Sequence, residues 1–366
     1  MGTTEIEDQG VRVMKTLEQQ IADTIYTSIS QLSNEIVSIQ QPKWADISPK
    51  YGMNQAKHSD YGRHDLCQLA EALTASNPPQ YARYIVWLRA MLRSHQVPDF
   101  FVELNLETEQ AALGRVLPPE SHPIISHYMQ SARDALKEED KFNLSFLKDT
   151  GAHTELAKKY LKVLLAGERG EASQLITRAI ESGVSIQDIY LRVLAPCLYE
   201  VGRLWQTGRI TVAHEHFFSA ATQFIMSELY PLIHKHVAQK GRVAVAACVA
   251  GELHEIGLRM ITDLLELEGW RTFYLGANTP SLSVVEIVRE KKAQLLALSI
   301  CLPTSGPALR ELISIVREQP GDGVRIIIGG YAISVDPVYA ASFGADGLAV
   351  NAGEAVAMMN SLVKGE

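Results

Sequence analysis

The chain has 366 residues, of which 42 are acidic and 34 are basic, giving a net charge of −8 at pH 7. This length predicts two or three domains. The acidic, polar first residues do not resemble a signal peptide, and no apolar run reaches the ~18 residues of a membrane span. The sequence has no basic stripe, so direct DNA binding is not expected. Four scattered cysteines (Cys67, Cys197, Cys248, Cys301) argue against disulfides and a structural zinc site, and favour a cytoplasmic protein.

Residues 1–145 are predicted to form a helical domain. Apolar residues recur at three- and four-residue steps from Met14 to Ile36, which predicts a long amphipathic helix. The prolines and glycines of residues 41–63 are expected to break the helix, and Asp65 is expected to cap a second one. Three more helices are predicted over residues 81–95, 100–117 and 124–139. One interpretation of this domain is a plain bundle for packing or dimerisation.

Residues 146–238 contain four amphipathic segments joined by short, glycine-containing links. Short links favour antiparallel neighbours, so we predict a four-helix bundle.

Residues 239–366 change pattern, because short apolar runs alternate with amphipathic segments. Apolar runs without alternation indicate strands buried on both faces. Strict alternation of strand and helix predicts a doubly wound parallel sheet of the Rossmann or flavodoxin-like type. Ligands of such sheets bind beyond the carboxyl ends of the strands.

His254 lies at that edge, in the turn after the first predicted strand. The local sequence, AGELHEIG, lacks the G-x-G-x-x-G pattern of dinucleotide sites. A neutral imidazole is a common metal ligand, and a ligating histidine usually donates its second N–H to a carboxylate, here Glu252. Gly257 would let the following helix lie close to the ligand. One histidine cannot hold a bare ion, so a metal here would have to arrive already chelated, in haem or a corrin. Taken alone, a histidine in such a loop is more often a helix cap or a solvent-exposed residue.

Two further strands end at the same edge. One ends at Ser299 and the other at Gly329 and Gly330. A hydroxyl beside two residues without side chains predicts a deep slot that suits a flat, extended tail.

These positions together resemble the cobalamin-binding signature D-x-H-x-x-G, S-x-L, G-G. The matching residues are Glu252, His254, Gly257, Ser299, Cys301, Gly329 and Gly330. Glutamate replaces the aspartate of the signature, and Cys301 replaces its leucine.

The resemblance implies that cobalamin binds with its dimethylbenzimidazole tail displaced from cobalt. His254 would then be the lower axial ligand of the metal. Ser299 would hydrogen-bond the buried tail, and Gly329 and Gly330 would make room for it. Ser305 would extend the relay from the carboxylate to the histidine.

The bundle resembles the cap of CarH-like photoreceptors, because Trp205 is followed ten residues later by Glu215 and His216. The resemblance implies an adenosylcobalamin light sensor, in which photolysis of the cobalt–carbon bond rearranges domains and oligomer. Trp205 would cover the adenosyl group, while Glu215 and His216 would accommodate it. Gln206 stands where those proteins carry a second cobalt-binding histidine, and His214 or His216 would have to replace it.

The first residues do not resemble the DNA-reading domain of those transcription factors, so we expect the helical domain to take its place. Photocobilins pair a cobalamin module with a bilin, and a similar arrangement would place biliverdin or another bilin near this domain. Cys67 would be its thioether anchor, although an apolar helix face favours burial of this thiol. Candidate partners of the pigment are Tyr61, His64, Tyr81, Tyr84, Trp87 and Arg89.

Two other classes share the cobalamin fold. A corrinoid methyl carrier of a methyltransferase system is the alternative to the light sensor. An adenosylcobalamin mutase would need a barrel of ~250 residues, for which the chain has no room. We therefore expect a binding protein rather than an enzyme, assembled as a dimer or tetramer and acting on a downstream signalling protein.

Overall fold

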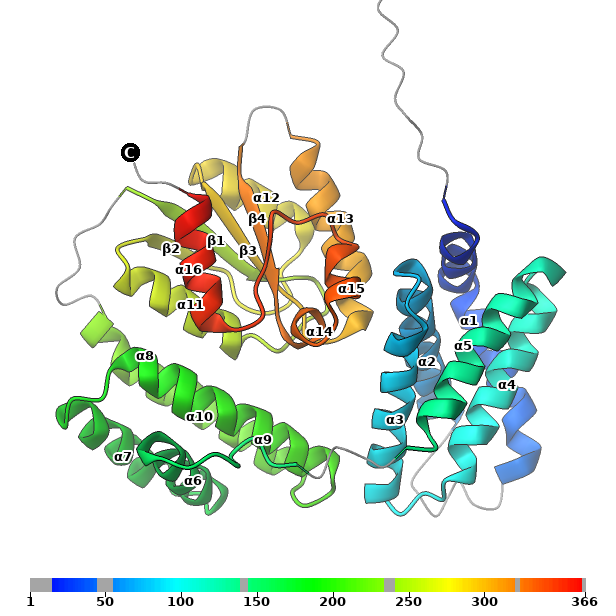
Figure 1. Cartoon of the computed structure of the whole chain (residues 1–366), viewed down its shortest axis with the longest axis horizontal. Helices are drawn as coiled ribbons and strands as arrows, with labels where there is room; N and C mark the ends of the chain where they lie inside the picture. Colours follow the sequence, from blue (N-terminus) through cyan, green and yellow to red (C-terminus); the bar gives the residue numbers. More distant parts are fainter. Residues whose placement is uncertain (1–14, 45–54, 139–143, 234–240, 320–322, 364–366) are drawn as a thin grey trace, which may run out of the picture.

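The computed structural model describes residues 15–44, 55–138, 144–233, 241–319 and 323–363. Within them the chain forms three parts: a helical N-terminal part, a helical bundle and a parallel sheet covered by helices (Figure 1). This is the predicted fold class.

The N-terminal part is a group of helices around one buried apolar cluster. Its elements are α1 (Leu17–Trp44), α2 (Gln55–Thr74), α3 (Pro78–Ser94), α4 (Phe100–Val116), the 3-10 turn η2 (Pro119–Ser121) and α5 (His122–Ala135). The predicted cap at Asp65 is wrong, because α2 begins ten residues earlier and Asp65 is buried in its middle. Gly62 does not end α2 despite its low helix propensity, because the helix is held by packing against the buried apolar cluster that it shares with α1.

The bundle has four helical segments packed around a second buried cluster. They are α6 (Ala152–Leu165), α7 (Arg169–Glu181), the run of α8 (Ile186–Asp188), the π-helical turn η4 (Ile189–Leu194) and α9 (Ala195–Gln206), and finally α10 (Val212–Ile233). The π-helical turn precedes Pro196, which has no N–H to donate to the helix, so the hydrogen-bond pattern changes there.

The sheet contains five parallel strands in the order β2-β1-β3-β4-β5, the flavodoxin-like arrangement. The strands are β1 (Val243–Cys248), β2 (Arg271–Tyr274), β3 (Leu295–Ser299), β4 (Arg325–Gly329) and β5 (Gly347–Leu348). One face packs on α12 (Ser281–Glu290) and α13 (Gly306–Arg317), and the other on α11 (Ile256–Leu267) and α16 (Ala352–Leu362). Burial on both faces explains why the strands lack alternation.

Three short helical turns complete this part at the carboxyl edge of the sheet. They are η6 (Pro303–Ser305), α14 (Tyr331–Ser334) and α15 (Pro337–Ala341).

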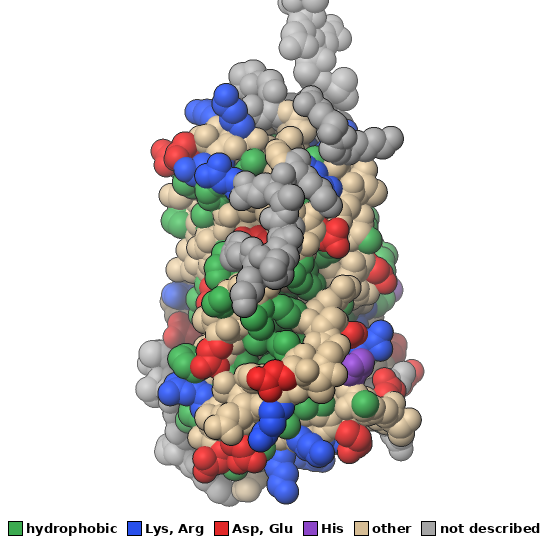
Figure 2. All heavy atoms as spheres, turned by 90° about the vertical axis from the view of Figure 1, so that its left-hand side faces the viewer, with side chains coloured by type: hydrophobic (Ala, Val, Ile, Leu, Met, Phe, Trp, Pro, Cys, Tyr) green, Lys and Arg blue, Asp and Glu red, His purple; other side chains and the backbone are tan. Residues whose placement is uncertain are grey.

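The bundle lies against α11 of the sheet part. Met260 and Leu264 of α11 belong to the buried cluster of the bundle, and Tyr190 donates a 2.7 Å hydrogen bond to Asp263. Figure 2 shows the face of the molecule that lies on the left-hand side of Figure 1. Hydrophobic side chains gather midway down this face, with charged side chains above and below them. The packing brings α10 beside the loop that carries His254.

Candidate functional site

His254 lies in the loop between β1 and α11, at the carboxyl edge of the sheet. Its side chain is 59% exposed, whereas Glu252 is 1% exposed. The Nδ1 atom of His254 lies 2.6 Å from Oε1 of Glu252, and its backbone N–H donates to the same oxygen at 2.9 Å. With Nδ1 engaged, the Nε2 atom is the nitrogen left for a ligand.

The second oxygen of Glu252 is held by the loop that follows β3. The backbone N–H of Cys301 donates to Oε2 at 2.6 Å, that of Leu302 at 3.3 Å, and the Ser305 hydroxyl lies 3.5 Å away. Burial opposes ionisation of Glu252, but hydrogen bonds from His254 and Cys301 outweigh it and hold the pKa below its ordinary value. The structure therefore brings Ser305 to the carboxylate, and it adds a backbone contact that the sequence did not reveal.

The thiol of Cys301 also lies near this pair, since one ligand atom from each of Glu252, His254 and Cys301 lies within 4.8 Å of the other two. Burial, followed by the charge of Glu252, raises the pKa of Cys301 to about 12. A protonated thiol is a poor metal ligand. The exposed imidazole nitrogen is therefore the better donor of the three.

Glu215 of α10 acts on His254 from the bundle. The hydrogen bond from Glu252 raises the pKa of His254, burial lowers it, and the charges of Glu252 and Glu215 raise it further, so the net shift is upward. Glu215 also accepts from Ser219 at 2.7 Å and pairs with His216 Nδ1 at 2.5 Å. The predicted cap residues Glu215 and His216 therefore belong to the same region as His254.

Trp205 and Gln206 end α9 in different surroundings. Trp205 is half-buried, whereas Gln206 is buried and its Nε2 atom has no hydrogen-bond partner among the described residues. His214 is exposed and its Nδ1 atom lies 2.7 Å from the Thr211 hydroxyl. Of the two histidines suggested as substitutes for Gln206, His216 is the one tied to Glu215.

The predicted slot lies where β3 and β4 end side by side. The register pairs Ser299 with Gly329, and Ser299 is buried. Gly330 has φ of 99°, and a Cβ there would overlap the carbonyl of Ile300. The backbone itself therefore requires glycine at position 330, whereas a Cβ on Gly329 would meet Ala349 only at 3.4 Å.

The carboxyl edge of the sheet that carries His254 also exposes apolar side chains. Four strands are each followed by an exposed apolar side chain: Leu253, Leu302, Tyr331 and Val350. A Cβ on Gly257 would meet nothing within 4 Å. Exposed apolar side chains at the same sheet edge as one exposed nitrogen donor fit the flat face of a large metal chelate such as a corrin ring.

Tyr199 and Tyr331 form an aromatic pair that the sequence did not indicate. Their rings, from α9 and α14, lie 6.1 Å apart, and Phe146 stacks on Tyr199 at 5.4 Å. Tyr331 directly follows Gly330 of the predicted slot, and this position is the sequence feature that could have pointed to it. The pair joins the bundle to the same edge of the sheet.

Most of the residues suggested for a bilin have partners within the helical part. Tyr84 donates to Asp65 and Tyr81 donates to Glu109, while Tyr84 stacks on Trp87 at 6.0 Å. Arg89 donates to the carbonyl of Leu136, His64 packs on Tyr84, and Tyr61 is exposed.

Cys67, the suggested anchor, is half-buried in α2. Burial, together with Glu71 and Asp65, raises the pKa of its thiol to about 11. The nucleophilic thiolate is therefore scarce at neutral pH.

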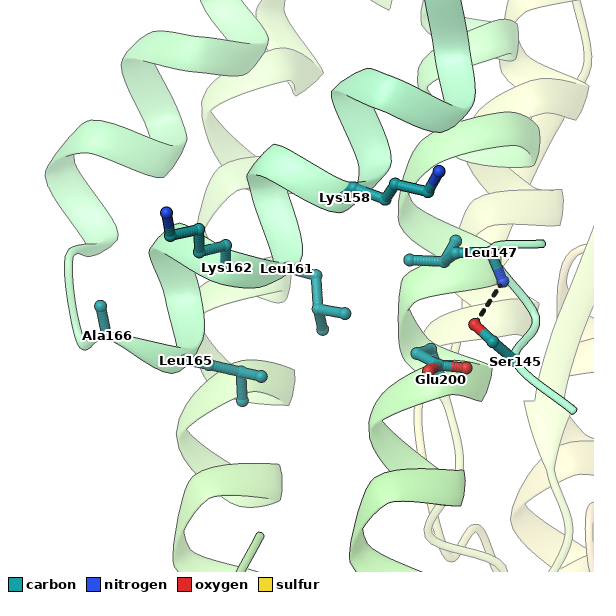
Figure 3. Close-up of a pocket in the computed structure, with 8 residues that line it drawn as sticks. All are labelled: Ser145, Leu147, Lys158, Leu161, Lys162, Leu165, Ala166 and Glu200. Atoms are coloured by element: carbon teal, nitrogen blue, oxygen red, sulfur yellow. Dashed lines mark hydrogen bonds between the residues drawn. The ribbon is translucent and has the colours of Figure 1, made fainter. Parts of the chain in front are cut away.

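A cavity of about 640 Å³ opens on the bundle, between α6, α9 and residues 145–147. Figure 3 shows Leu161 and Leu165 between the helices and the side chains of Lys158 and Lys162 on α6. Its lining includes none of the predicted site residues.

Comparison with known proteins identifies the two parts that meet at this site. Residues 242–358 match a family model described as B12 binding domain, and residues 156–230 match a second model with the same description. Dimethylamine corrinoid protein 1 of Methanosarcina acetivorans is 29% identical over 203 residues, covering 55% of this chain and 90% of that protein. The HTH-type transcriptional repressor CarH of Myxococcus xanthus is 31% identical over 140 residues, covering 38% and 46%.

The fold is also shared with a solved structure, that of the Methanosarcina barkeri monomethylamine corrinoid protein. The TM-score is 0.51 with 24% identity, over 58% of this chain and all of that one. None of the described helices combines the length and apolar content needed to cross a membrane. Because each of these two parts matches a B12 binding domain model, the bundle and the sheet part form a cobalamin-binding module.

Proposed function

We propose that this cobalamin-binding module is a corrinoid methyl carrier, in which His254 is the lower axial ligand of cobalt. The observation that carries the proposal is the exposed imidazole at the sheet edge, with Nδ1 held by the buried carboxylate of Glu252. The similarity to corrinoid proteins over 90% or more of their length supports the carrier role. In this proposal the domains are residues 1–145, 146–238 and 239–366.

Bound cobalamin supplies a cobalt centre whose upper position can carry an alkyl group. Glu252 keeps the proton of His254 on Nδ1 and orients Nε2 toward the ligand. The loop containing Cys301 and Ser305 holds Glu252 in place. Ser299, Gly329 and Gly330 border the slot for the displaced tail. The chain binds and orients the cofactor, and a partner methyltransferase performs the chemistry.

The second candidate is an adenosylcobalamin light sensor. The specific observation in its favour is that Glu215 is paired with His216 on α10 and contributes, after Glu252, to the raised pKa of His254. Trp205 would cover the adenosyl group, a bilin in the helical domain would be the second chromophore, and light would change the assembly of a homo-oligomer.

One experiment separates these candidates. The purified protein is loaded in the dark with methylcobalamin or adenosylcobalamin, and absorbance and mass by light scattering are recorded before and after green light. A carrier retains methylcobalamin and keeps the same mass in light and dark. A light-dependent change of mass with adenosylcobalamin would favour the sensor, and failure to retain any corrinoid would sink both.

A further inference from the structure

The helical N-terminal part is joined to the sheet part by a buried carboxylate, Glu71 of α2. The residue has no exposed surface. Its Oε1 atom accepts hydrogen bonds from Tyr26 and from the guanidinium of Arg310, and its Oε2 atom accepts one from Tyr339 at 2.7 Å. A buried carboxylate held by three donors is costly to leave unpaired, so this junction has a defined geometry.

Tyr339 carries the contact onward to the loop beside the histidine. Its hydroxyl lies 2.7 Å from Glu71 Oε2 and also 3.1 Å from the carbonyl oxygen of Pro303. Pro303 begins η6 immediately after Cys301 and Leu302, whose N–H groups hold Glu252. Hydrogen bonds therefore connect Glu71 through Tyr339 to the loop 301–303. The N–H groups of this loop bind Glu252, which in turn holds His254.

Gly306 shows how closely the two parts approach. It follows Ser305, and a Cβ at this position would overlap both the carboxylate of Glu71 and the hydroxyl of Tyr339. Both obstructing groups are buried, so they cannot swing aside. The close approach of α2 to the start of α13 requires glycine here.

Two more contacts attach the helical part. Asp336, at the start of α15, accepts from Asn77 at 2.6 Å and from Arg83. A Cβ on Gly208, just after α9, would lie 3.0 Å from Ser94. The helical part thus contacts both the sheet part and the bundle.

We propose that the N-terminal helical part positions the histidine of the corrinoid site, with Glu71 and Tyr339 as positioning residues that hold the loop 301–305. The inference rests on the proposed role of His254 in binding cobalt. Docking of the helical part keeps this loop in place and so keeps Glu252 against His254. Because coupling is reciprocal, a bound corrinoid also tightens the docking of the helical part.

The first test uses the protein without corrinoid, so it does not depend on cofactor binding. Tyr339→Phe removes the bridging hydroxyl but keeps the ring. Tyr128→Phe is a matched control, since Tyr128 is also fully buried and also bonds a carboxylate, Glu18, and a backbone carbonyl, Ala72. Hydrogen exchange is measured for the amides of Cys301 and Leu302.

Tyr339→Phe should speed exchange at these two amides by about fivefold, as expected for one lost hydrogen bond, while Tyr128→Phe leaves them unchanged. Equal exchange rates in the two variants overturn the proposal. Exchange in β1 serves as the reference, so general destabilisation is recognised by acceleration there as well.

The second test follows the corrinoid itself. Full-length protein loaded with hydroxocobalamin is diluted, and the dissociation rate and absorbance spectrum are recorded for Glu71→Gln, Glu71→Ala and Tyr128→Phe. We expect faster release for Glu71→Ala, an intermediate rate for Glu71→Gln, and the normal rate for Tyr128→Phe. A normal rate for Glu71→Ala overturns the positioning role alone. Normal corrinoid binding by His254→Ala would instead overturn the proposed function.

Discussion

The carboxylate of Glu252 joins two loops at the site, because one oxygen lies 2.6 Å from Nδ1 of His254 and the other 2.6 Å from the backbone nitrogen of Cys301. The imidazole is exposed, while the group that orients it is buried. Such an arrangement fixes the direction of Nε2 before any ligand arrives, and preorganisation of this kind favours binding.

Replacing His254 should abolish the cobalt–imidazole bond. For His254→Ala we expect a loss of hydroxocobalamin affinity greater than the ~10–100-fold that removal of an outer partner typically costs. His127→Ala is the control, since His127 is an exposed histidine of α5. Binding is measured by equilibrium dialysis with absorbance, and an unchanged spectrum in His254→Ala would contradict the proposed site.

Replacing Glu252 should lower the pKa of His254. The wild-type imidazole should titrate above its ordinary value of 6.5, and in Glu252→Gln without corrinoid it should titrate lower, because the charge that stabilises the imidazolium is lost. The NMR titration of the ring protons measures this. Glu286→Gln, an exposed change in α12, should leave the titration unaltered.

The same pair makes stability depend on pH. The raised pKa of His254 gives a contribution that is complete below about 6.5 and is lost as pH rises through the folded-state value. The lowered pKa of Glu252 gives one that is complete above 4.5 and is lost as pH falls through its folded-state value. The free energy of unfolding is measured in urea for wild type and Glu252→Gln across pH 3–9. The difference between the two proteins should shrink at both ends of this pH range.

The two neighbouring glycines of the slot should respond differently to alanine. Gly330→Ala should lower the free energy of unfolding by at least ~1–3 kcal/mol, because φ is 99° and the new Cβ overlaps the backbone of Ile300. Gly329→Ala should lower stability less than Gly330→Ala, because its Cβ would meet Ala349 only at an ordinary contact distance, while it weakens corrinoid binding. Thermal unfolding measures the stability of each variant and equilibrium dialysis its corrinoid binding. Equal stability losses would contradict the conclusion that the backbone requires glycine at position 330 but not at 329.

The helical part contains a buried acid pair that should lower stability as pH rises. Burial, and then the charge of Asp65, raises the pKa of Glu109 to about 8. Since the folded state then holds protons that the unfolded state releases, stability should fall between pH ~4.5 and 8. Glu109→Gln should flatten this dependence, whereas Glu107→Gln, exposed on the same helix, should not.

The residues expected to cover the upper face of the corrin distinguish the two candidate functions. If Trp205 covers an adenosyl group, Trp205→Ala should weaken adenosylcobalamin binding about tenfold, roughly the worth of one aromatic stacking contact, and spare methylcobalamin. A carrier should show similar, small losses for both. Parallel dialysis with the two cobalamins in the dark measures the ratio.

Sequence patterns predicted the elements of the sheet part well, because each βα unit carries its own strand, turn and helix signals. They failed at Asp65, where a polar residue ahead of an apolar run suggested a cap. In the structure this side chain accepts from Tyr84 and Asn105 inside the helical part. A capping aspartate and a buried aspartate look the same in the sequence. Only the side chains that hydrogen-bond to it in the folded protein distinguish the two.

The sequence by itself determined that a histidine with a nearby carboxylate lies at the carboxyl edge of a parallel sheet, since strand, turn and glycine positions are local properties. Only the tertiary structure decided what fastens them. Cys301 is 49 positions from Glu252, and Tyr339 is 268 positions from Glu71. Such pairs depend on strand register and on how separate cores pack together, and no local pattern records either.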